Sequence, residues 1–223
     1  MHAAIRNRAD YSALTDRERA ALFHEDELTD SYSSPFADHE ERLAARLAVK
    51  VAAHAHSEGS SLKDFVVLHA ASGAPMIRGR DSLHCSLSHS KGYAVGVVAT
   101  YRVGVDLEQV RVHDERIMDV IASKSEWGIL PSEFSRHERI TLLWTIKEAI
   151  LKAVESGLSI SPRQVELISC TQDTNEKAVT YSSIVRLSGW SKNWRVESRN
   201  FSDLFLSIAY EENNHETITY HWH

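Results

Sequence analysis

The 223-residue chain contains little cysteine, proline or glycine, with two, four and nine residues of each. Cys85 and Cys170 are too few for a disulfide framework, which predicts a reducing compartment such as the cytoplasm. The scarcity of proline and glycine leaves no linker of low complexity. The length and a hydrophobic content of 43% suit one large domain or two small ones.

A long apolar run is also missing. The first residues, MHAAIRNRADYSALTDRERAALF, contain no stretch apolar enough for a signal peptide, and no later segment could span a membrane. The net charge of −6 argues against general binding of nucleic acid, so an anion site would need a local concentration of Lys and Arg. We therefore expect neither a membrane nor a nucleic-acid partner.

Histidine is abundant but scattered. His54 and His56, like His221 and His223, lack Cys or carboxylate partners at the spacing of a zinc site, and there is no HExxH motif. We do not expect zinc.

Hydrophobic periodicity predicts two long helices among strands. The first begins at Ser34-Pro35 and ends near Gly59, and the second spans about 136 to 155 and ends at Gly157. The first thirty residues read as an extended arm with a short helix after Thr15. A further helix is expected over 113–123, and strands over 64–70, 82–89, 92–101, 102–110, 163–169, 177–187, 193–198, 203–212 and 217–222.

A faint repeat links the two halves of the chain. LAVKVAAHA (47–55) aligns with WTIKEAILKA (144–153), which sets Lys50 against Lys147. GYAVGVVATY likewise resembles DLFLSIAY near the end. Helices that interrupt antiparallel-looking strands predict an α+β fold of two similar halves. Chance similarity between two helices rich in Ala, Leu and Lys is the alternative.

The second long helix carries charge in an apolar setting. Lys147 falls at the centre of a hydrophobic face, while Glu148 and Lys152 lie in a narrow polar wedge. A helix that is apolar almost all round is normally buried, and unpaired buried charge costs several kcal/mol. Something must therefore neutralise these side chains.

A second charged group lies in the strand VGVDLE. Asp106 and Glu108 are two residues apart, so both side chains point to one face of the strand. With Glu148 they would provide three carboxylates, which suit Mg²⁺ and its bound phosphates, and Lys147 and Lys152 would flank them. The alternative is that the two acids only protect an edge strand from aggregation.

Two other segments could bind phosphate. Ser88 and His89 in SLSHSKG lack a GxSxG elbow and an acidic third member, so they fit hydrogen bonding to phosphate or hydroxyl better than nucleophilic catalysis. Arg42, Arg46 and Lys50 form a basic stripe on the first long helix. A structural histidine and a solvated basic face are the alternatives.

These motifs together resemble the 4′-phosphopantetheinyl transferases. That family is marked by a strand reading Gly-Ile/Val-Asp-x-Glu and, some forty residues later, Phe/Trp-x-x-Lys-Glu-Ala/Ser-x-x-Lys. Here Gly104 to Glu108 and Trp144 to Lys152 fill every position, and the resemblance covers residues 38 to 160. The length resembles the surfactin-synthetase-activating type, in which two half-domains related by a pseudo-twofold axis form one chain, each a long helix on a small, mostly antiparallel sheet.

The resemblance implies transfer of the 4′-phosphopantetheine arm of coenzyme A to a serine of an apo acyl or peptidyl carrier protein, releasing adenosine 3′,5′-bisphosphate. Residues 1–101 would form the half on the adenosine and 3′-phosphate side, and residues 102–223 the half with Mg²⁺ and catalysis. The metal, with Mn²⁺ as an alternative, would be held by Asp106, Glu108 and Glu148. Glu148 or a metal-ordered water would be the general base, and Lys152, with Lys147 nearby, would stabilise the pyrophosphate.

The resemblance also implies binding surfaces. Contacts to the phosphates of coenzyme A would come from Arg46, Lys50, Ser88 and His89, and the turn from Gly73 to Pro75 would border the adenine. Ala74 stands where the family often has Lys. The carrier would dock near residues 110–139, where basic and apolar side chains lie together: Arg111, Arg116, Lys124, Arg136, Arg139, Ile129, Leu130 and Phe134. We expect a monomer, because both halves of the site lie in one chain.

Two other functions would also use acids and lysines of this kind. A metal-dependent phosphohydrolase or nuclease usually has a Lys two residues after its paired acids, but Gln109 and Val110 follow Glu108 here. A non-catalytic module that binds carrier domains or coenzyme A would be expected to have lost an acid or a lysine, and none is lost.

Overall fold

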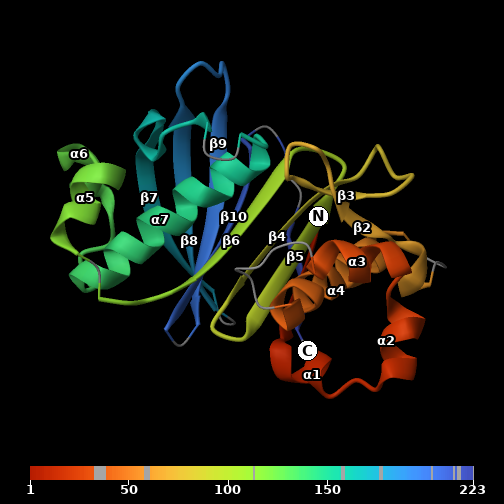
Figure 1. Cartoon of the computed structure of the whole chain (residues 1–223). Helices are drawn as coiled ribbons and strands as arrows, with labels where there is room; N and C mark the ends of the chain where they lie inside the picture. The colour runs from red at the N-terminus through yellow and green to blue at the C-terminus, as the bar shows by residue number, and fades with distance from the viewer. Residues whose placement is uncertain are drawn as a thin grey trace. The chain divides into compact units, whose positions relative to one another are not determined.

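The computed structural model describes residues 1–32, 39–57, 61–112, 114–156, 159–175, 178–201, 203–212, 214 and 217–222. The chain forms two compact units (Figure 1). Unit 1 contains Met1–Val103 and Glu216–His223, and unit 2 contains Gly104–His215. Each unit is a long helix packed on a mostly antiparallel sheet, which confirms the predicted α+β class.

Unit 1 is built on a sheet with the order β11-β1-β5-β4 among the described residues. Its strands are β1 (His2–Asn7), β4 (His84–Ser90), β5 (Tyr93–Ala99) and β11 (Thr219–Trp222). β1 is parallel to β11 and antiparallel to β5. The long helix α4 (His39–His56) packs on β5, β1 and β4. Smaller elements complete the unit: α1 (Arg8–Ser12), α2 (Asp16–Leu22), α3 (Glu25–Tyr32), the 3₁₀ helix η1 (Leu62–Asp64), β2 (Val67–His69) and β3 (Pro75–Ile77).

Two expectations for unit 1 were wrong. The start of the chain is not an extended arm, because β1 pairs on both sides and buries Ala3, Ala4 and Ile5. The last strand does not belong with the second half, because β11 joins β1. The short helix after Thr15 is confirmed as α2, whose capping box is formed by Thr15 and Glu18.

Unit 2 contains a sheet with the order β6-β10-β9-β8-β7 within the described part of the chain. These strands are β6 (Val103–Gln109), β7 (Val165–Asn175), β8 (Ala178–Leu187), β9 (Asn193–Phe201) and β10 (Leu204–Glu211). The long helix α7 (Arg136–Ala153) packs on β10 and β9 (Figure 1). Before and after it lie α5 (Glu115–Ile121), α6 (Lys124–Ile129) and the 3₁₀ helix η3 (Pro162–Gln164).

The predicted helix ends are only partly observable. The second long helix begins where expected, because Ser135 and Glu138 form a capping box before α7. Ser34, Pro35, Gly59 and Gly157 lie outside the described residues. None of the described helices is both long and apolar enough to cross a membrane.

Each long helix touches a strand at a glycine. A Cβ atom added to Gly104 in β6 would lie 1.9 Å from the carbonyl oxygen of Ala149 in α7. In unit 1, a Cβ on Gly96 in β5 would lie 2.2 Å from the backbone nitrogen of Val49 in α4. Because both clashes are with backbone, no side-chain rotation relieves them. The lack of a side chain at Gly104 and at Gly96 therefore allows each long helix to lie this close to its strand.

We predict that Gly104→Ala lowers the free energy of unfolding by about 3 kcal/mol or more, because α7 must move away from β6. Chemical denaturation followed by tryptophan fluorescence measures this. Gly128→Ala in α6 is the control, since an added Cβ there meets nothing within 4 Å. It should leave stability unchanged or raise it by up to about 1 kcal/mol. Equal effects of the two changes would contradict the proposed close contact.

Candidate functional site

Lys147, at the centre of the apolar face of α7, is fully buried in an ion pair. Its Nζ lies 2.7 Å from Oε1 of Glu126 and donates to the carbonyl oxygen of Pro162 at 3.1 Å. Glu126 also accepts from the backbone nitrogens of Ser123, at 2.7 Å, and Leu167, at 3.0 Å. Burial pushes the pKa of Glu126 up, but these hydrogen bonds outweigh it and leave the pKa below its ordinary value.

Lys50 in α4 is held in the same way. Its Nζ lies 2.8 Å from Oε2 of Glu27 and donates to the carbonyl oxygen of Phe65 at 2.6 Å. Glu27 accepts from the backbone nitrogens of His24, at 2.8 Å, and Val67, at 2.9 Å. In both units, then, the lysine of the long helix pairs with a glutamate of a preceding helix that also binds the start of a later strand. The repeat predicted from Lys50 and Lys147 is confirmed by these contacts.

The two pairs change the roles expected for these lysines. The exposed fraction of both Lys50 and Lys147 is 0%, and burial lowers the pKa of each while its glutamate partner opposes that shift. A phosphate could reach neither Nζ without breaking a buried ion pair. The expectation that these two lysines contact the phosphates of coenzyme A is therefore wrong for this structure. The neutralising group sought for Lys147 is Glu126.

Asp106, Glu108, Glu148 and Lys152 form a second charged group, the carboxylate cluster. Lys152 Nζ lies 2.7 Å from Oδ1 of the buried Asp106. Glu108, two residues further along β6, lies 3.2 Å from Nη2 of Arg111. Glu148 comes from α7, one turn before Lys152, and the close approach at Gly104 brings that helix to β6.

The pKa values of Glu148 and Glu108 are both raised. Burial raises the pKa of Glu148 above its ordinary 4.5, and the charges of Asp106 and Glu108 raise it further, against Lys152. Burial and then Asp106 raise the pKa of Glu108 in the same way, against Arg111 and Lys152. A cation placed among these oxygens would relieve the repulsion, and such a donor set suits Mg²⁺ or Mn²⁺. Among the described residues, no three His, Cys, Asp or Glu side chains already converge as metal ligands would.

Unit 1 has the ion pair but not the cluster. With Lys50 aligned to Lys147, Val51 and Ala55 stand at the positions of Glu148 and Lys152. The feature common to both units is therefore structural, whereas the carboxylate cluster belongs to unit 2.

The arginine expected to bind phosphate, Arg46, is 1% exposed, so a solvated basic face is wrong for this part of the stripe. Its Nε donates to the carbonyl oxygen of Val67 at 3.1 Å, and its Nη2 lies 3.3 Å from Nδ1 of His69. His69 pairs with Pro75 across the β2–β3 hairpin, whose turn contains Gly73 at φ 87°. Arg46 and the Gly73–Pro75 turn thus lie close together.

Ser88 and His89 are neighbours on β4 and so point to opposite faces of the sheet. They cannot act on each other as a catalytic pair. Ser88 is buried, and Nδ1 of His89 lies 3.0 Å from Oε2 of Glu41. Glu41 also accepts from the backbone nitrogen of Gly92 at 3.2 Å. Glu41 was missed from the sequence, where nothing distinguished it from other acids at the start of a helix.

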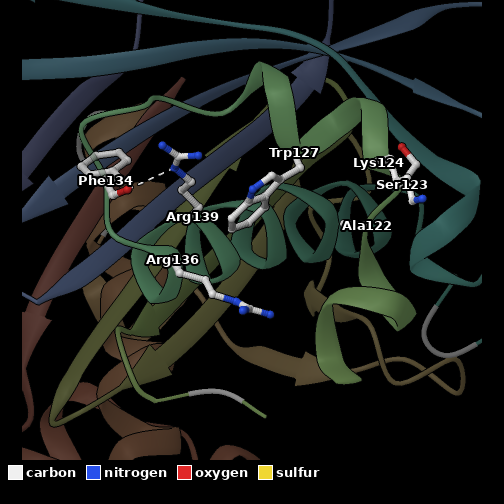
Figure 2. A pocket seen from close by; sticks show the side chains of 7 residues that line it. All are labelled: Ala122, Ser123, Lys124, Trp127, Phe134, Arg136 and Arg139. Carbon is white, nitrogen blue, oxygen red and sulfur yellow. Dashed lines mark hydrogen bonds between the residues drawn. The ribbon is translucent and has the colours of Figure 1, made fainter. Parts of the chain in front are cut away.

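Two hollows lie on the surface of unit 2 where carrier docking was expected. One, of about 480 Å³, runs from Glu108 and Arg111 to Ile140 and Trp144, and its lining includes Val112 and Val120, which are 86% and 60% exposed. The other, of about 700 Å³, is shown in Figure 2. It is lined by Ala122, Ser123, Lys124, Trp127, Phe134, Arg136 and Arg139.

In this second hollow the guanidinium of Arg139 is held in place. It lies 5.3 Å from the centre of the Trp127 ring, and its Nε donates to the carbonyl oxygen of Phe134 at 3.1 Å (Figure 2). The hollow therefore combines fixed positive charge with aromatic surface.

Residues 102–209 match the family model of the 4′-phosphopantetheinyl transferase superfamily. That range contains the whole carboxylate cluster. Over these residues the chain is similar to this superfamily. The two units found in one chain agree with the predicted resemblance to the pseudo-dimeric, surfactin-synthetase-activating type.

Two curated proteins of this class are similar to parts of the chain. The 4′-phosphopantetheinyl transferase psf-1 of Bacillus pumilus is 34% identical over 89 residues, which cover 39% of this chain and 38% of that protein. The 4′-phosphopantetheinyl transferase gsp of Aneurinibacillus migulanus is 24% identical over 157 residues, covering 59% and 65%. The chain thus spans less than two thirds of either relative. A solved holo-[acyl-carrier-protein] synthase of Thermotoga maritima aligns with a TM-score of 0.36 and 20% identity over 50% of this chain and 63% of that one.

We predict that Glu148→Gln flattens the pH dependence of stability in metal-free protein. A carboxyl whose folded pKa is raised binds more protons in the folded than in the unfolded state, so stability falls as pH rises from about 4.5 through the folded pKa. Glu148→Gln removes this titration. The free energy of unfolding of the variant, relative to that of wild type, should therefore be higher at pH 7 than at pH 4. Urea unfolding at both pH values, with chelator present, measures the difference. Glu155→Gln, which lies just after the end of α7 and outside the cluster, is the control. A constant difference between wild type and Glu148→Gln would contradict the repulsion.

Proposed function

We propose that the chain transfers the 4′-phosphopantetheine arm of coenzyme A to a serine of an apo carrier protein. The observation that carries this proposal is the carboxylate cluster with Lys152, which unit 1 lacks and which lies within the region matched by the family model. In the reaction the serine oxygen bonds to the β-phosphorus of coenzyme A. The bond from that phosphorus to the bridging oxygen breaks, and adenosine 3′,5′-bisphosphate leaves.

Asp106, Glu108 and Glu148 would hold Mg²⁺, or Mn²⁺ in its place. When bound, the metal supplies positive charge to the pyrophosphate oxygens. Lys152, already paired with Asp106, adds a second positive charge beside the leaving group. The serine proton would go to Glu148 or to a nearby water as the general base.

We assign coenzyme A's adenosine end to unit 1. Arg46, Ser88 and His89 are proposed to contact phosphate, and the turn from Gly73 to Pro75 to border the adenine. The contact between Arg46 and His69, which pairs with Pro75, supports a common position for the arginine and the turn. Arg78, a possible substitute for the missing lysine at Ala74, is instead paired with Asp26.

The carrier is proposed to dock on residues 110–139. Carrier proteins of this class present an acidic helix beside their serine, and the two hollows offer basic side chains next to apolar ones. The hollow that reaches Glu108 would place the docked serine near the carboxylate cluster. A monomeric, cytoplasmic enzyme remains our prediction.

The direct test is incubation with coenzyme A, Mg²⁺ and apo acyl and peptidyl carriers, read by intact mass. We predict addition of phosphopantetheine to at least one carrier, and loss of addition with chelator. Asp106→Ala, Glu108→Ala and Glu148→Ala should each lower the rate by about a hundredfold or more, because each removes charge from the proposed metal site. Circular dichroism checks that the variants are folded.

Several outcomes would count against this proposal. Near-normal turnover by one variant would remove that residue from the metal site. Hydrolysis of coenzyme A without transfer would favour a phosphohydrolase, and carrier binding without either reaction would favour a non-catalytic module.

For the docking surface, we predict that Lys124→Glu and Val120→Asp raise KM for the carrier about tenfold and leave KM for coenzyme A unchanged. Steady-state kinetics with each substrate varied in turn measures both constants. Arg111 is a poor choice for this test, because its contact with Glu108 ties it to the metal site. Lys192→Glu, paired with Glu211 elsewhere in unit 2, is the control. Parallel changes in both KM values would show that the surface is misplaced.

A further inference from the structure

The Lys147–Glu126 ion pair adjoins Glu148 in sequence but has no part in the chemistry proposed above. We propose that it is a positioning pair, which fixes the rotation of α7 about its axis and so places Glu148 and Lys152 beside Asp106. This inference rests on the proposed function for its kinetic consequences. The geometry behind it is independent of that function.

The pair is connected widely enough to fix a helix. Glu126 lies in α6, where it completes the capping box with Ser123, and it reaches β7 through the backbone of Leu167. Lys147 reaches η3 through the carbonyl oxygen of Pro162. A single ion pair thus ties α7 to three other elements. Both side chains are at most 4% exposed, so water cannot replace one partner when the other moves.

The cluster depends on the rotation of α7. Successive helix residues are turned by about 100°, so Lys147 and Glu148 lie on different faces, whereas Glu148 and Lys152 share one. Gly104 touches the helix backbone at Ala149 and Ala153, which fixes its distance from β6 but leaves rotation open. A rotation of about 10° moves a group at a side-chain radius of about 5–6 Å by about 1 Å. Functional groups tolerate displacements of only about 0.5 Å.

Unit 1 provides a matched comparison within the same chain. Lys50 and Glu27 form the same kind of pair at 2.8 Å, equally buried, with equivalent backbone partners at His24 and Val67. Its helix carries Val51 and Ala55 where α7 carries Glu148 and Lys152. Loss of this pair should therefore affect folding without disturbing a carboxylate cluster.

The experiment compares two double variants that remove both charges and keep side-chain volume, Lys147→Met/Glu126→Gln and Lys50→Met/Glu27→Gln. Each variant is assayed at a temperature well below its unfolding midpoint. The measured quantities are kcat, both KM values and Mn²⁺ affinity, and the affinity is obtained from the electron paramagnetic resonance signal of free Mn²⁺. We expect the first variant to lose at least about tenfold in kcat and a similar factor in Mn²⁺ affinity, since a displacement of about 1 Å can cost a hundredfold. The second should stay within about threefold of wild type in both.

If the pair has a purely structural role, both double variants should unfold at a lower temperature than wild type. Their kcat and Mn²⁺ affinity should then be the same in the two variants. That result, or a normal Mn²⁺ affinity in the first variant, would overturn the inference. If a double variant does not fold, Glu126→Asp and Glu27→Asp give the same comparison while keeping each charge pair. If the wild-type protein transfers nothing, the proposed function fails, yet the difference in Mn²⁺ affinity still decides whether the pair positions the cluster.

Discussion

A lysine buried beside a glutamate is the interaction on which each unit depends. Such a pair gains little net energy, because removing two charges from water cancels most of their attraction. The pair instead favours a single packing of the elements that carry the two side chains, because any displacement leaves an uncompensated charge in the core. In each unit the glutamate also accepts one backbone hydrogen bond from the start of its own helix and one from a later strand. The pair therefore sets which helix, strand and 3₁₀ helix can meet.

In the carboxylate cluster, by contrast, like charges lie close together and repel one another. Burial and neighbouring carboxylates raise the pKa of Glu108 and of Glu148, and Lys152 opposes these shifts only in part. Such an arrangement lowers the stability of the free protein and favours binding of a cation. The duplicated helix of unit 1 has an aliphatic side chain at both corresponding positions and carries no such cost. The two units thus share a scaffold, and one of them carries the charge needed for chemistry.

The carboxylates and the long helix of unit 2 were predictable, because their signals are local. Asp106 and Glu108 share a strand face by spacing alone, and α7 shows its periodicity and its capping box in contiguous sequence. Glu126 was not predicted as the partner of Lys147, because the two lie 21 residues apart in sequence and only folding brings them together. For the same reason Lys50 and Lys147 looked like ligands for phosphate. Strand β1 was missed because its few apolar residues make sense only beside β5 and β11.

The parallel pairing of β1 with β11 makes unit 1 discontinuous along the chain, with all of unit 2 inserted before its last strand. A ribosome therefore exposes every segment of unit 2 before it has delivered Thr219–Trp222 to the first sheet. Unit 2 can close on contiguous sequence, whereas the second side of β1 stays unpaired until β11 has been synthesised. Until then an unpaired strand edge is available to other nascent chains. Completion of the first sheet therefore depends on residues that follow all of unit 2 in sequence.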